Sequence, residues 1–122
     1  MPLSRTLGFG SDARLTSRTD FQRLFASGRR ISGRNLNLWF CVGPDSSAPA
    51  RLGLSVSAKV GNAVRRNRLK RLTREAFRLN RAHLKLGSDL VAALRPNCHW
   101  TGLQQAQSDF MEICRKADLI AG

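Results

Sequence analysis

The hydrophobic period changes at Asn62, and this change limits the folds open to the chain. Before it, residues 35–42 and 51–58 alternate apolar and polar side chains, which is typical of strands with one buried face. After it, Leu69, Leu72, Ala76 and Leu79 recur with a period of about 3.6 residues, up to about residue 82. The sequence therefore predicts two strands followed by a long amphipathic helix.

Three further elements complete the pattern. A short helix is expected over 18–27, where Phe21, Leu24 and Phe25 share a face and Gly28 follows as a stop. Residues 89–94 read as a strand, and a last helix follows 101, where Thr101 and Gln104 resemble a capping box. This order predicts a single α+β sandwich domain over 17–122. Residues 1–16 show no periodicity and are expected to form a partly ordered basic N-terminal arm.

The charge balance points to a polyanionic partner. The 122 residues carry 21 Lys and Arg against 8 Asp and Glu, a net charge of +13. Such an excess repels itself in a compact fold, so a nucleic acid is the favoured partner, ahead of an anionic membrane surface. The sequence contains no apolar stretch long enough to cross a membrane and does not begin like a signal peptide, so a cytoplasmic location is expected.

Most of the excess charge lies between Lys59 and Lys85, which contains ten cations and one acid, Glu75. On a helix, the face opposite the leucine stripe carries Arg66, Lys70, Arg71, Arg74, Arg78 and Arg81. Arg65, Arg66 and Arg68 also crowd the helix start, where the macrodipole favours anions. Phosphate binding explains this arrangement; the alternative is an ordinary solvated charged face.

A second candidate surface is the polar face of the predicted sheet. Trp39 stands there beside Asn37, while the neighbouring strands offer small side chains: Gly53, Ser55 and Ser57, with Val91 and Ala93 as further candidates. A large aromatic among small residues predicts a shallow trough in which a base of a single strand can stack on the indole. Phe21 and Phe25 could form its wall, or could simply fix their helix to the core.

The residues do not suggest a catalytic centre within the protein. The acidic side chains are scattered, whereas a metal-dependent nuclease needs clustered carboxylates. Cys41, Cys98 and Cys114 form an odd, widely spaced set, which predicts reduced thiols instead of a disulfide framework or a zinc site. We therefore expect neither catalytic nor metal-ligating residues in this chain.

The run from Arg51 to Glu75 resembles the signature of the protein component of bacterial ribonuclease P, with Arg66-Asn67-Arg68 as its Arg-Asn-Arg core. The resemblance extends upstream through Asp20, Phe21, Phe25 and Gly28, and weakly to the last helix, over about residues 14–120. It implies an αβββαβα fold with a left-handed βαβ crossover into the Arg-rich helix. It also implies that an RNA subunit hydrolyses precursor tRNA at its 5′ end with Mg²⁺ that the RNA mainly holds, while one copy of the protein assists.

The resemblance assigns the candidate site residues by position. Those expected to contact the catalytic RNA are Asn62, Arg65, Arg66, Arg68, Lys70, Arg71 and Arg74. Those expected to line a cleft for the 5′ leader are Phe21, Phe25, Trp39, Ser55, Ser57 and Lys59. Two positions depart from the family pattern, since Ala58 replaces a frequent lysine and Trp39 a smaller aromatic. The alternatives are a ribosomal or general RNA-binding protein outside any hydrolytic complex, and a nuclease that needs no RNA.

Overall fold

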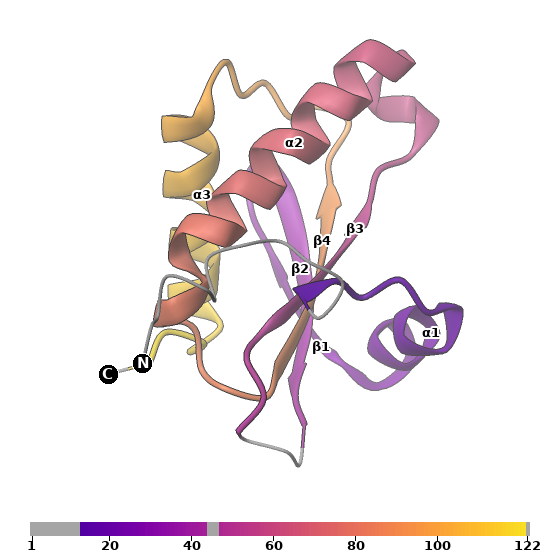
Figure 1. The fold of residues 1–122 in the computed structure, drawn as a ribbon. Helices are drawn as coiled ribbons and strands as arrows, with labels where there is room; N and C mark the ends of the chain where they lie inside the picture. The colour runs from indigo at the N-terminus through magenta and orange to yellow at the C-terminus, as the bar shows by residue number, and fades with distance from the viewer. Residues whose placement is uncertain (1–12, 44–46, 122) are drawn as a thin grey trace.

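The computed structural model describes residues 13–43 and 47–121, and it has the expected element order αβββαβα (Figure 1). The helices are α1 (Arg18–Ser27), α2 (Ala63–Asn80) and α3 (Leu103–Lys116). The strands are β1 (Arg29–Ser32), β2 (Leu36–Val42), β3 (Arg51–Ser55) and β4 (Ser88–Leu94). Two short 3-10 turns, Ala58–Val60 and Arg81–His83, flank α2.

The four strands form one mixed sheet in the order β1-β2-β4-β3. β2 is antiparallel to both β1 and β4, whereas β3 and β4 are parallel and are joined through α2. Parallel neighbours need a long crossover connection, and here the Arg-rich helix is that connection. The crossover therefore places α2 against the sheet.

Helices cover both faces of this sheet. α2 and α3 pack on one face, where Leu38, Leu90, Phe77 and Phe110 belong to the main core, with the two phenylalanine rings 6.2 Å apart. α1 crosses the other face, where Leu24 and Val91 form a smaller cluster with Leu15. Figure 1 shows α1 set apart from the pair α2 and α3. The sheet face beneath α1 is the one that carries Trp39.

The end of the predicted N-terminal arm packs on the domain. Ala13 and Leu15 are buried. The backbone of Arg14 forms an isolated parallel β-bridge with Leu52, and the Leu15 N–H donates to the Leu52 carbonyl at 3.0 Å. Residues 1–12 of the proposed arm lie outside the described residues. The bridge and the hydrogen bond thus attach residues 14 and 15 to β3.

Several local predictions were wrong at element ends. The residue pattern also failed to predict β1, because this strand has only four residues and most of them are exposed. β3 ends at Ser55 and not at residue 58, because the Ser57 hydroxyl accepts the Lys59 N–H and starts a 3-10 turn. At the start of α3, the Thr101 N–H and hydroxyl both donate to Gln105 Oε1 and not to Gln104.

The buried stripe of α2 is rotated from the predicted one. Leu79 is 37% exposed, and Phe77 is buried in its place. Thr73 and Asn80 are also buried, because their side chains donate to the carbonyls of Leu69 and Ala76 within the helix. The predicted stripe contained only apolar residues, so it missed these polar residues, whose side chains find hydrogen-bond partners within the helix.

Candidate nucleic-acid interface

The start of α2 is shaped by a glycine and a cap. Asn62 is the N-cap, and its Oδ1 accepts the Arg65 N–H at 2.9 Å. Gly61 has φ 148°, and a Cβ there would lie 2.6 Å from Arg65 Cδ. The side chain of Arg65 therefore folds back over a position that only glycine fits. Asn62, which was expected to contact RNA, thus uses its side-chain oxygen to cap α2.

Two arginines at the start of α2 are oriented by the loop after β4. Arg65 donates through Nε to the Val60 carbonyl at 2.9 Å and through Nη2 to the Cys98 carbonyl. Arg68 donates through Nη2 to the Thr101 carbonyl at 2.7 Å. Each guanidinium has five N–H donors, so these bonds fix its direction and leave donors for an anion. The loop thus preorganises the cationic end of the helix.

An aspartate on α3 holds that loop in turn. Asp109 Oδ2 accepts the Trp100 indole N–H at 2.7 Å and the Asn35 amide at 2.6 Å. Asn35 also accepts the Arg95 N–H through its main-chain carbonyl. Sequence reasoning missed this support because its members are far apart in the chain and carry no motif.

The rest of the cationic face of α2 borders two adjoining hollows. One is lined by Arg14, Thr16, Phe21, Gly53, Lys70 and Arg74, and the other by Arg14, Asn67, Lys70, Arg71, Arg74, Glu75 and Arg78. They share Arg14, Lys70 and Arg74, so they form one basic groove between α1 and α2. Arg14 is a groove residue that the sequence analysis did not single out.

Three predicted members of the cationic face have particular environments. Arg81 is 4% exposed, and its Nε donates to the Ala50 carbonyl at 2.8 Å, so its place on the solvent face was wrong. Arg78 pairs with Glu75, and this hydrogen bond lowers the pKa of the carboxyl. The Nε of Arg66 is buried and has no hydrogen-bond partner among the described residues.

Phe21, Phe25 and Trp39 form an aromatic row that runs from above β3 to β2. Phe21 covers Gly53, where a Cβ would lie 2.6 Å from the Phe21 ring. The rings of Phe21 and Phe25 are 6.2 Å apart, and Phe25 meets Trp39 edge-on at 5.1 Å. Phe25 is 40% exposed, so the row both packs α1 and presents ring surface. The geometry is therefore compatible with both roles considered for Phe21 and Phe25, which are to form the wall of the trough and to fix α1 to the core.

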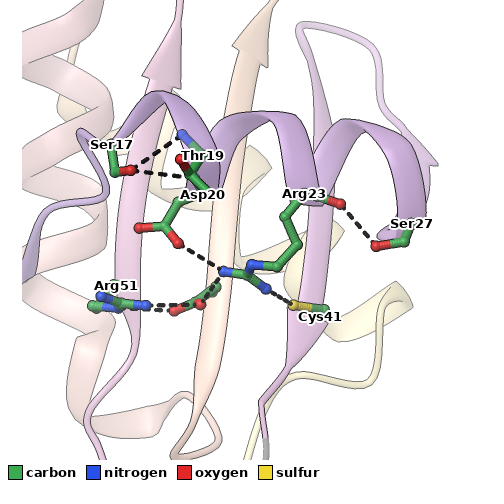
Figure 2. A network of polar contacts seen from close by, with 8 residues as sticks. Ser17, Thr19, Asp20, Arg23, Ser27, Cys41 and Arg51 are labelled. Atoms are coloured by element: carbon green, nitrogen blue, oxygen red, sulfur yellow. Dashed lines mark hydrogen bonds and ion pairs between the residues drawn. The ribbon is translucent and has the colours of Figure 1, made fainter.

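An ion-pair network holds α1 on the sheet (Figure 2). Asp89 of β4 accepts from Nε and Nη2 of Arg51, at 3.0 and 2.9 Å, and from Nη2 of Arg23 at 2.9 Å. Arg23 also donates to Asp20 and to the Cys41 sulfur. The Asp89 hydrogen bonds raise the pKa of both guanidinium groups. The network fixes the position of α1, and with it Phe21 and Phe25.

The strand register divides the α1 face of the sheet into three transverse rows of side chains. One row is Arg51, Asp89 and Cys41, and the next is Gly53, Val91, Trp39 and Arg30. The third row is Ser55, Ala93, Asn37 and Ser32. The described side-chain contacts of α1 fall on the first two rows. Gly53 and Val91, expected in an open trough, are therefore covered, and the third row remains beside the aromatic row.

The remaining cleft residues lie toward the start of α2. Ser55 ends β3 and is half-buried, and Ser57 and Lys59 are exposed in the turn that leads to Gly61. Lys59 thus lies between the third row and the cationic start of α2 in the chain path. The structure brings Phe21, Phe25 and Trp39 into contact, and it places Ser57 and Lys59 in the adjoining turn.

Other kinds of site find little support in the described residues. Over residues 13–43 and 47–121, no three His, Cys, Asp or Glu side chains gather as metal ligands. Cys41, Cys98 and Cys114 are free thiols, and burial raises the pKa of Cys114 to about 12. No helix in the described part of the chain has the length and apolar character needed to span a membrane.

Comparisons with known proteins agree with these features. The family model described as Ribonuclease P matches residues 9–118. The ribonuclease P protein component of Alkaliphilus metalliredigens is 33% identical over 111 residues, covering 91% of this chain and 98% of the relative. The ribonuclease P protein of Staphylococcus aureus superposes with a TM-score of 0.79 at 30% identity, covering 88% and 97% of the two chains. That of Thermotoga maritima gives 0.74 at 28% identity, covering 84% and 96%. The chain therefore belongs to the bacterial ribonuclease P protein family, the RNA-binding components of a tRNA-processing ribonuclease.

Proposed function

We propose that this chain assists a catalytic ribonuclease P RNA in removing the 5′ leader of precursor tRNA. The observation that carries the proposal is the basic groove of Arg14, Lys70 and Arg74, which meets the aromatic row at Phe21. Cations that track a backbone beside rings that stack bases are the combination found in single-strand binding proteins. We therefore place the leader in this groove, which moves Lys70 and Arg74 to the leader site from the RNA-subunit contacts that the resemblance implied.

The start of α2 is assigned to the RNA subunit. Arg65 and Arg68 are held by carbonyl groups at a helix N-terminus, where phosphates are favoured. Preorganised arginines lose less rotational freedom when they bind than mobile ones do. Binding there would stabilise the folded RNA by neutralising phosphates that repel one another.

Mg²⁺ enters this proposal through the RNA. Among the described residues, no three His, Cys, Asp or Glu side chains lie close enough together to hold a metal ion. The RNA subunit would mainly hold the Mg²⁺ that hydrolysis needs, and the protein would lower the Mg²⁺ requirement because its cations replace part of the counterion atmosphere. One copy of the chain would act in each holoenzyme.

The test adds the purified protein to a bacterial ribonuclease P RNA at low Mg²⁺ and measures 5′ processing of a precursor tRNA. We expect stimulation, with product ends identical to those made by the RNA alone at high Mg²⁺. Binding of the RNA without stimulation would favour a general RNA-binding protein. Processing by the protein without RNA would contradict the assignment of the chemistry to the RNA.

A further inference from the structure

An arginine outside the Arg51–Glu75 signature, Arg30, lies beside Trp39 at the end of the aromatic row. Arg30 lies on β1 opposite Trp39, and its guanidinium carbon is 5.6 Å from the centre of the indole ring. β1 is the edge strand of the sheet, and Arg30 is exposed. A cation seated on an aromatic ring keeps its in-plane N–H donors free for another partner.

The acids on this face are not available to Arg30. Asp89 is bound by Arg51 and Arg23, and Asp20 pairs with Arg23. Among the described residues, no ion pair involves Arg30. Its charge therefore faces solvent at the outer end of the row, about 14 Å or three strand spacings from β3.

We propose that Arg30 is the outer phosphate contact of the leader site and that it acts with Trp39. A leader that starts in the basic groove and crosses the sheet along the aromatic row reaches β1 last. Trp39 would stack on a base, and Arg30 would hold the phosphate beside it. Only leaders long enough to cross the sheet would gain from this contact. The inference rests on the proposed function and adds the direction and reach of the leader.

The competing explanation is that Arg30 merely protects an edge strand from pairing with another chain, which charged residues commonly do. The neighbouring residue separates the two. Arg29 is exposed on the same strand, but its guanidinium lies on the opposite face, 5.8 Å from the Phe40 ring. Edge protection and general electrostatic attraction apply to both arginines, whereas leader binding applies to Arg30 alone.

The experiment uses holoenzyme reconstituted with a bacterial ribonuclease P RNA and precursor tRNAs whose leaders are lengthened one nucleotide at a time. Wild type, Arg30→Gln and the matched control Arg29→Gln are compared for precursor affinity at several salt concentrations. For long leaders we expect Arg30→Gln to weaken binding roughly three- to tenfold, the range of one net hydrogen bond. The slope of log affinity against log salt should fall by about 0.7, the contribution of one single-strand phosphate. Short leaders and mature tRNA should bind the variant like wild type, and Arg29→Gln should match wild type throughout.

Two results would overturn the inference while leaving the proposed function intact. One is an equal loss in Arg29→Gln and Arg30→Gln, and the other is a loss in Arg30→Gln that does not depend on leader length. If the wild-type holoenzyme itself bound precursor and mature tRNA equally well, the proposed function would fail, and this inference with it.

Discussion

Arg23 Nη2 lies 2.9 Å from Asp89 Oδ2, and this ion pair joins α1 to β4, which is 66 residues away in the chain. Asp89 is the centre of the contact, because its side chain is 10% exposed and also binds Arg51. The helix that it holds carries Phe21 and Phe25. A carboxylate that contacts no proposed ligand thus determines where the aromatic row lies.

Asp89→Asn should loosen α1. The change removes the negative charge and turns one of the two acceptor oxygens into an NH2 donor that faces two guanidinium groups. This should lower the free energy of unfolding by about 1–3 kcal/mol; both guanidinium groups are partly hydrated, so the cost falls below that of a fully buried pair. Denaturant unfolding measures this loss. Asp118→Asn is the control, because its pair with Lys85 is on the surface, with Asp118 92% exposed. Equal stability of the two variants would exclude the anchoring role.

Trp39→Ala should weaken precursor binding in the holoenzyme by about 1–3 kcal/mol, the range of one base–aromatic stacking contact. Affinity for mature tRNA should not change, because the leader is absent from it. Titrations of both RNAs provide the comparison. The same loss for both would remove the aromatic row from the leader site.

Arg65→Ala and Arg68→Ala should differ in stability. The guanidinium of Arg65 is half-buried and bonds two carbonyls, so its loss should cost about 1–3 kcal/mol of unfolding free energy. Arg68 makes one exposed bond to Thr101, and its loss should cost less than about 1 kcal/mol. Both variants should bind ribonuclease P RNA more weakly. Intact RNA binding by a folded Arg68→Ala protein would contradict the role of the α2 start.

Gly53→Ala should displace Phe21, since the added Cβ would lie 2.6 Å from the ring and 2.9 Å from the Leu15 carbonyl oxygen. Overpacking of this kind costs about 1–3 kcal/mol. A Cβ at Gly102 meets nothing within 4 Å, so Gly102→Ala is the steric control. For Gly53→Ala, both the thermal unfolding temperature and the affinity for precursor tRNA should fall. If Gly53→Ala were as stable as Gly102→Ala, α1 would not be packed tightly against β3.

Alkylation should distinguish the three thiols. Burial raises the pKa of Cys114 to about 12 and also raises that of Cys98, so both stay protonated and unreactive near pH 8. Cys41 is half-buried and should react first in the folded protein. Mass spectrometry after brief iodoacetamide treatment locates the modified residue. Early modification of Cys114 would mean that α3 opens readily.

The elements with a clear local period were predicted well. The range 18–27 for α1 was confirmed, and β2 and β4 lie within a residue or two of their predicted ranges. The faces of β2 were also right near its middle, where Leu38 is buried and Trp39 is on the opposite side. The alternation failed at Val42, the last residue of β2, which is 53% exposed.

The candidate site was predicted in composition but not in arrangement. Residue type and spacing identified the cationic helix start and the aromatic residues, the resemblance assigned them to the RNA subunit and the leader, and these assignments stay predictions. Arg81 was misplaced because its burial depends on a carbonyl of Ala50, 31 residues earlier. The support of the loop after β4 by Asp109 likewise depends on α3 lying beside the end of β4.

The sequence alone determined that the chain has an Arg-rich helix with one apolar face and a strand that carries Trp39 opposite its core residues. Both follow from local periodicity, which needs no knowledge of distant contacts. The tertiary structure decided which arginines are held by carbonyl groups, which face α1 covers, and that Arg30 lies on Trp39. These relations depend on strand order and register, which bring together residues that no local pattern connects.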